Sequence, residues 1–124
     1  MKGIRMQGGI PLQGKVRIQG SKNAVLPILA ATLLTNEVSY IQNCPRIADV
    51  HRFVHLLREL GCLVHWQEKG IRVQPGENEE LPCERAEARR MQGEAITGMR
   101  SSLCLLGALL GRCGYVTMEH PGGC

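Results

Sequence analysis

A cation and an amide at the start of an apolar stretch are the first side chains of this chain that could do chemistry. The segment Gly20-Ser21-Lys22-Asn23 follows an alternating stretch and precedes a run, 24–34, that is apolar on nearly every face. Ser21 can cap a helix that starts here, and the preceding glycine lets a substrate approach the backbone. The N–H groups at a helix N-terminus favour an anion. Lys22 and Asn23 would therefore hold a phosphate or a carboxylate there, although an ordinary capped helix with solvated polar residues fits the same pattern.

Three more polar residues carry potential chemistry. Arg100 opens the apolar run 103–110, where a charge needs an anionic partner or a path to water. Cys124 follows two glycines, and Asp49 stands at the start of a helical pattern, where a carboxylate complements the helix dipole. Taken singly, Arg100 and Asp49 are compatible with structural roles. Cys124, taken alone, is compatible with no particular role.

The elements that position these residues can be expected from periodicity. The first half of the chain predicts strands at 3–8 and 15–19, a helix at 22–34, a strand at 38–41, a helix over 47–60 and strands at 63–66 and 71–73. Apolar residues in the second helix recur at spacings of three and four, and Gly61 follows it at the usual glycine position after a helix.

The second half of the chain is less regular. We expect a polar linker at 75–84, a helical region over 86–112 whose true start lies near Gly98, a stop at Gly114 and a strand at 115–118. The segment 29–45 is echoed by 105–121, each an apolar helix, a turn, a strand and a proline. This echo predicts a repeated unit that is cut off before it completes.

Composition limits the classes of function. The chain has 124 residues, 44% of them hydrophobic, which suits one α/β domain with a core. Four aromatic residues (one Trp, two Tyr, one Phe) and a dispersed net charge of +4 disfavour a nucleic-acid surface. No apolar run is long enough for a membrane span, so we expect a soluble protein without membrane or nucleic-acid partners.

The six cysteines have no CxxC pair and no regular spacing, and the chain starts without a secretory leader. His51 and His55 are four residues apart but lack a third ligand. We therefore expect neither a disulfide framework nor a zinc site, and a cytoplasmic location.

Three segments together resemble the enolpyruvyl transferases. They are Gly20 to Ala31 with its Lys-Asn pair, Met99-Arg100-Ser101-Ser102, and the terminal Pro121-Gly122-Gly123-Cys124. Their order and separations fit the family from the first strand to the last residue. The Lys-Asn pair and the Pro-Gly-Gly-Cys loop match the branch that acts on UDP-N-acetylglucosamine, whereas the sister branch of the shikimate pathway carries Lys-Ser at the first site.

The resemblance implies an enzyme that transfers the enolpyruvyl group of phosphoenolpyruvate to the 3′-hydroxyl of UDP-N-acetylglucosamine, without metal or organic cofactor. It implies that Lys22 contacts phosphoenolpyruvate, Asn23 holds the sugar nucleotide and Arg100 lies near the substrates' phosphates. Cys124 matches the loop cysteine proposed as a general acid or in product release, and a thiol near cations has a lowered pKa. The alternative is a non-catalytic binding or scaffold module that keeps the fold.

The resemblance also implies a fold. Family members are inverted α/β barrels built of β-α-β-α-β-β units in two domains, with the active site between them. Residues 1–21 would be strands belonging mainly to the domain completed by a missing C-terminal part. Residues 22–124 would be the first unit and part of the second unit of the other domain, truncated. We expect such a fragment to be inactive alone, marginally stable and prone to self-association.

Overall fold

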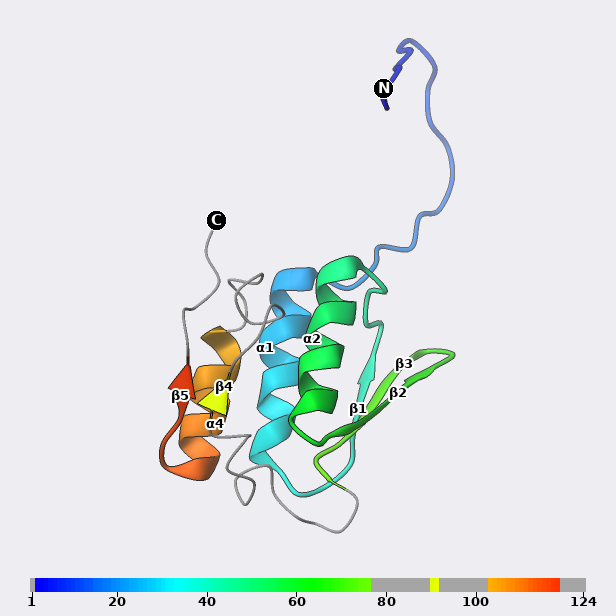
Figure 1. Cartoon of the computed structure of the whole chain (residues 1–124). Helices are drawn as coiled ribbons and strands as arrows, with labels where there is room; N and C mark the ends of the chain where they lie inside the picture. Colours follow the sequence, from blue (N-terminus) through cyan, green and yellow to red (C-terminus); the bar gives the residue numbers. More distant parts are fainter. Residues whose placement is uncertain (1, 77–89, 92–102, 119–124) are drawn as a thin grey trace.

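A computed structural model describes residues 2–76, 90–91 and 103–118. Figure 1 shows the helices of this part beside a small sheet, with the N-terminal segment extending away from the body. The elements in chain order are α1 (Lys22–Ala31), the 3₁₀ helix η1 (Thr32–Leu34), β1 (Ser39–Gln42), α2 (Ala48–Glu59), β2 (Leu63–Gln67), β3 (Gly70–Gln74), β4 (Arg90–Met91), α4 (Leu103–Cys113) and β5 (Thr117–Met118). The described part is therefore mixed α/β, as predicted.

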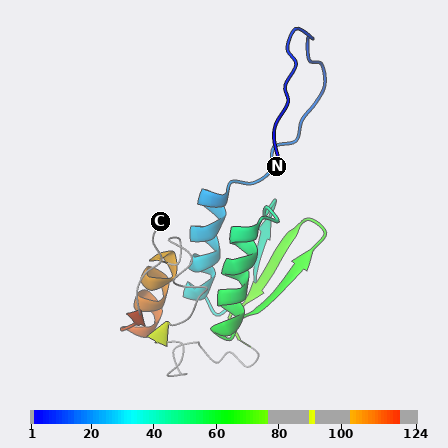
Figure 2. The ribbon, with the colours of Figure 1, turned by 45° about the horizontal axis from the view of Figure 1, so that its top comes forward.

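The three helices lie in a row, in the order α4, α1, α2, and the sheet lies beyond α2. Figures 1 and 2 show them parallel, with their N-terminal ends at the same end of the molecule, where the chain of residues 2–20 also leaves the body. Helix α1 packs against α2 on one side and α4 on the other. This arrangement brings the starts of helices that are far apart in sequence to one end of the fold.

The main sheet has the strand order β1-β3-β2, and both neighbouring pairs are antiparallel. Residues alternate between its two faces, so that Ile41, Ile71 and Trp66 align across the core side while Tyr40, Arg72 and His65 align across the other. The alternation in β3 is regular, because Ile71 and Val73 are buried between less buried neighbours. The sheet thus covers the helices with one face only.

One apolar core joins the helices to the sheet. Its largest fully buried side chains are Phe53, Leu29, Leu33, Leu56, Leu57, Ile71, Leu105, Leu109, Val50, Val54 and Val64. Each such side chain contributes about 1.5–3 kcal/mol through the area it removes from water. The core therefore depends on α1, α2, α4 and the sheet together, and it fixes the relative positions of the helix N-termini.

Helix α2 ends as its sequence predicts. Gly61 adopts φ 97°, a left-handed conformation that favours glycine, and its N–H donates to the carbonyl of Arg58 at 2.9 Å. The N–H of Cys62 donates to the carbonyl of Leu57 at 3.0 Å. These two bonds form a Schellman motif, which satisfies helix-end carbonyls and turns the chain into β2.

Arg112, in the last turn of α4, ties this helix to the chain that follows α1. Its guanidinium donates to the carbonyl of Leu33, to the carbonyl of Thr35 at 2.9 Å and to the side chain of Asn36 at 2.5 Å. Carbonyls at a helix C-terminus lack intrahelical donors, so a charged donor from a neighbouring helix is favourable there. Arg112 therefore links the two helical segments across the core.

Two predictions about strands are wrong. Residues 3–8 and 15–19 form no strand: no described segment pairs with them, and their apolar side chains are exposed, Leu12 between them by 95%. A strand needs a partner for its backbone groups, whatever its alternation.

Arg90–Met91, placed by the pattern in a helical region, instead pair in parallel with Thr117–Met118. The expected linker lies outside the described residues from 77 onward, as does the predicted helix start near Gly98.

The remaining elements agree with the sequence prediction to within a few residues, and Gly114 ends α4 with φ 79°. Among the cysteines that the structure describes, Cys44, Cys62 and Cys104 are free thiols. Cys113 is disulfide-bonded, and the irregular spacing of the cysteines did not predict this bond.

Candidate functional site

The candidate site begins at the N-terminus of α1. Ser21 is the N-cap residue with an extended backbone (φ −78°, ψ 133°), and its carbonyl accepts the N–H groups of Ala24 at 3.2 Å and Val25 at 2.9 Å. Ser21 thus occupies the expected N-cap position, but its side chain makes no capping hydrogen bond. The first turn carries no acidic residue. The positive end of the helix dipole is therefore not offset by a carboxylate on α1 itself.

Gly20 has a packing role that the sequence pattern did not predict. A Cβ added at Gly20 would lie 2.1 Å from the carbonyl oxygen of Asn43 and 3.2 Å from the side chain of Pro45. The missing side chain therefore lets the segment before α1 approach the segment before α2. The approach of a substrate to the backbone at Gly20 stays a prediction.

Lys22, the first residue of α1, forms an ion pair with Asp49 in the first turn of α2. The Nζ atom donates to Oδ2 over 2.8 Å, and the two side chains are 46% and 35% exposed. The hydrogen bond from Lys22 lowers the pKa of Asp49; Arg52 lowers it further, while burial opposes both effects. The pair thus joins the N-termini of two parallel helices.

Sequence reasoning gave Asp49 only the task of complementing the dipole of α2. Its position in the first turn agrees with that task, but its pairing with Lys22 was missed. The two residues are 27 positions apart, and no local pattern relates them. Only the packing of α1 against α2 brings the two side chains together.

The other predicted site residues differ in what the structure says of them. Asn23 is exposed beside Lys22, and no described residue forms a hydrogen bond with its side chain. Arg100 and Cys124 lie outside the described residues. Helix α4, which starts at Leu103 soon after Arg100 in sequence, has its N-terminal end at the same end of the fold as Lys22 (Figure 1). The predicted convergence of Lys22, Arg100 and Cys124 therefore stays a prediction.

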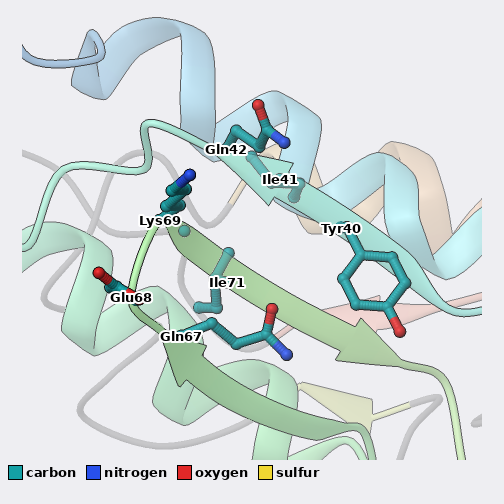
Figure 3. A pocket seen from close by; sticks show the side chains of 8 residues that line it. Tyr40, Ile41, Gln42, Gln67, Glu68, Lys69 and Ile71 are labelled. Atoms are coloured by element: carbon teal, nitrogen blue, oxygen red, sulfur yellow. The ribbon is translucent and has the colours of Figure 1, made fainter.

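Two shallow hollows lie near the ends of the sheet strands. The larger, of 360 Å³, is lined from β1 by Tyr40, Ile41 and Gln42, from β2 by Gln67, from the β2–β3 turn by Glu68 and Lys69, and from β3 by Gly70 and Ile71 (Figure 3). The smaller, of 210 Å³, is lined by Arg17, Asn43, Cys44, Arg46, Glu68, Lys69 and Gly70. Neither hollow is lined by Lys22 or Asn23, although the smaller one shares Asn43 with the Gly20 contact.

Arg46, at the smaller hollow, is held in place by two contacts. It donates to the carbonyl of Gln67 at 2.9 Å, and its guanidinium lies 4.9 Å from the ring centre of Trp66. The lining of this hollow contains three cationic side chains and one carboxylate. Positive charge therefore exceeds negative charge next to the segments that precede α1 and α2.

Two other kinds of site are absent from the described residues. Among the described positions, no three His, Cys, Asp or Glu side chains gather as metal ligands would. Nor does any helix in the described ranges have the length and apolar character that crossing a membrane requires.

Known proteins are similar to this chain over its whole length. The family model described as EPSP synthase (3-phosphoshikimate 1-carboxyvinyltransferase) matches residues 6–124. Among curated relatives, the chain is 37% identical over 124 residues to a protein of Methylacidiphilum infernorum (isolate V4) and 43% identical over 124 residues to one of Sorangium cellulosum (strain So ce56). It is 39% identical over 125 residues to one of Oleidesulfovibrio alaskensis.

All three relatives carry the name UDP-N-acetylglucosamine 1-carboxyvinyltransferase. The matches cover 100% of this chain but only 27%, 28% and 28% of the three relatives, respectively. The chain thus spans little more than a quarter of their length.

Proposed function

This chain belongs to the EPSP synthase family, and from that premise we propose that it contributes to a UDP-N-acetylglucosamine 1-carboxyvinyltransferase. The 3′-hydroxyl of the sugar nucleotide gives up its proton and its oxygen adds to C2 of phosphoenolpyruvate, while a proton adds to C3, which forms a tetrahedral adduct. Loss of a proton from C3 and of phosphate, by cleavage of the bond between C2 and the phosphate oxygen, then restores the double bond and leaves an enolpyruvyl ether. The observation that carries the proposal is that relatives of this name match the chain over its whole length at 37–43% identity.

Four residues take the roles that the family resemblance assigns. Lys22 contacts phosphoenolpyruvate, Asn23 binds the sugar nucleotide and Arg100 lies near the substrates' phosphates. Cys124 serves as a general acid. No metal or organic cofactor takes part in this proposal.

The electrostatics at the start of α1 support this assignment. Both substrates carry several negative charges, and donors that are fixed before the reaction stabilise developing charge best. Helices α1, α2 and α4 present their N-terminal ends at the same end of the fold (Figure 2), and Lys22 is the first residue of α1. The positive ends of their dipoles favour an anion there.

The biological setting follows from the proposed reaction. It would be the first committed step of peptidoglycan synthesis, in the cytoplasm, and would serve cell-wall formation, cell shape and cell division. Small molecules, rather than nucleic acids or membranes, would be its binding partners. We expect the 124 residues alone to bind substrate without turnover, since they correspond to only about 27% of the relatives' length.

Ligand titration of the isotope-labelled chain tests the proposal. We expect UDP-N-acetylglucosamine and phosphoenolpyruvate to shift amide resonances at the start of α1, and Lys22→Ala and Asn23→Ala to weaken these shifts. Lys2→Ala is the matched control, because Lys2 is exposed in the N-terminal segment away from α1. An absence of shifts at 20–26 in the unmodified chain would overturn the proposal. A phosphate-release assay completes the test, and turnover by the 124 residues would contradict the expected inactivity.

Exposed apolar side chains favour self-association of the chain. Ile28 on α1, Leu34 on η1, and Leu103 and Leu110 on α4 are 43–58% exposed. Apolar groups on neighbouring helices gain free energy by leaving water. Light scattering should therefore show a mass that grows with concentration, and a clean monomer at all concentrations would contradict this expectation.

A further inference from the structure

The ion pair between α1 and α2 gives Asp49 a task that the reaction itself does not require. Lys22 has a long side chain with many rotamers, and its exposure of 46% leaves it room to move. Asp49 accepts one of its N–H groups at 2.8 Å. An ammonium has three such donors, so two remain for another acceptor.

The carboxylate of Asp49 is itself stabilised in place. It lies in the first turn of α2, where the helix dipole favours negative charge, and Arg52 acts on it from the same helix. Two cations and one anion therefore lie together here, so the group of Lys22, Asp49 and Arg52 keeps a net positive charge. An incoming anion meets a cation whose direction is already fixed.

We propose that Asp49 is a positioning residue for Lys22, holding its ammonium between the N-termini of α1 and α2 so that two donors face an incoming phosphoenolpyruvate anion. The proposal rests on the proposed function, because that function names the anion. Its physical basis is the geometry of the pair: a fixed cation loses less freedom on binding than a mobile one. Asp49 would then assist binding, although its charge alone would repel the ligand.

The two possible roles of Asp49, competition and positioning, have opposite effects on binding of the anion. If Asp49 merely competes with the anion for Lys22, then removal of its charge tightens binding. If Asp49 positions Lys22, then the same change weakens binding. Asp49→Asn separates these two cases, since it removes the charge with little change of shape.

The experiment has a ligand-free arm and a titration arm. Without ligand, heteronuclear spectra of the Lys22 ammonium should show slower proton exchange in the unmodified chain than in Asp49→Asn. With phosphoenolpyruvate, Asp49→Asn should weaken binding by about 1.5-fold to fivefold, the range of an exposed ion pair. In the Lys22→Ala background, Asp49→Asn should have no further effect.

Glu59→Gln is the matched control, because Glu59 also lies on α2 and pairs with His55 at 3.3 Å, four positions away. It should leave both readouts unchanged. Equal or tighter binding by Asp49→Asn, or an effect that persists without Lys22, would overturn the positioning role. Failure of the proposed function looks different: the Lys22 ammonium would still depend on Asp49, but phosphoenolpyruvate would cause no shift at α1 in the unmodified chain.

Discussion

Gly20 faces the carbonyl oxygen of Asn43 so closely that a Cβ on this glycine would lie 2.1 Å from that oxygen. The contact joins the segment before α1 to the segment before α2. Asn43 itself has φ 54°, a left-handed conformation, and its N–H donates to the carbonyl of Lys69 at 3.0 Å. The backbone at Asn43 thus contacts Gly20 on one side and the carbonyl of Lys69 on the other. These contacts help to set the distance between Lys22 and Asp49.

Gly20→Ala should destabilise the chain. Because the neighbouring atom belongs to a hydrogen-bonded backbone segment, it cannot move aside as a flexible side chain would, and we expect a loss of about 1–3 kcal/mol. Urea unfolding measures this change. Gly107→Ala is the contrast, because a Cβ at Gly107 meets nothing within 4 Å and alanine favours a helix by about 1 kcal/mol over glycine. Equal stability of Gly20→Ala and the unmodified chain would show that the close approach is not required.

Arg112→Ala should destabilise the chain by weakening the contact between α4 and the end of α1. The change removes three hydrogen bonds from a charged donor, two of them to backbone carbonyls. Bonds to charged groups contribute about 1.5–3 kcal/mol, and we expect a loss in that range. Thermal unfolding measures this loss of stability. Arg112→Lys should recover only part of the lost stability, since an ammonium lacks the planar fork of the guanidinium. Arg5→Ala, in the exposed N-terminal segment, should change stability by less than about 0.5 kcal/mol.

The helices could be predicted from local pattern because their causes are local. In α2 the apolar side chains Val50, Phe53, Val54 and Leu57 fall on one face, and Gly61 supplies the conformation that ends the helix. These features lie within a few residues of one another. The hairpin of β2 and β3 follows for the same reason, since its turn is short and its strands are adjacent in sequence.

The failures have non-local causes. Residues 3–8 and 15–19 alternate as strands do, but pairing depends on a partner that no pattern within them identifies. Arg90–Met91 pair with β5, a segment 27 positions later, and no pattern in the residues around them predicts this partner. At the site, Lys22 was predicted from its place at a helix start, whereas its partner Asp49 depends on how two helices pack. Arg100 and Cys124 stay predictions from the family resemblance.

The stability contributed by the Lys22–Asp49 pair should depend on pH. The pKa of Asp49 is lowered in the folded chain from 3.8, first by the hydrogen bond from Lys22. A carboxylate with a depressed folded pKa adds stability above its unfolded pKa, and this stability is lost as pH falls through the folded value. The stability difference between the unmodified chain and Asp49→Asn should therefore be constant above about pH 5 and vanish in stronger acid. Urea unfolding between pH 2 and 7 checks this, and a difference that persists at the acid end would contradict it.

Cys62 should be protected from alkylation as long as the chain is folded. It is 3% exposed, and burial raises its pKa to about 12, an effect that Arg112 opposes in part. The thiolate is the reactive form, so at pH 8 the folded chain presents Cys62 as an inert thiol. Burial raises the pKa of Cys44 as well, but its side chain is only half-buried. Brief treatment with iodoacetamide and peptide mass mapping should therefore label Cys44 before Cys62, and urea should remove the difference. Equal labelling of both in the folded chain would mean that the core around α2 and β2 opens more readily than its packing implies.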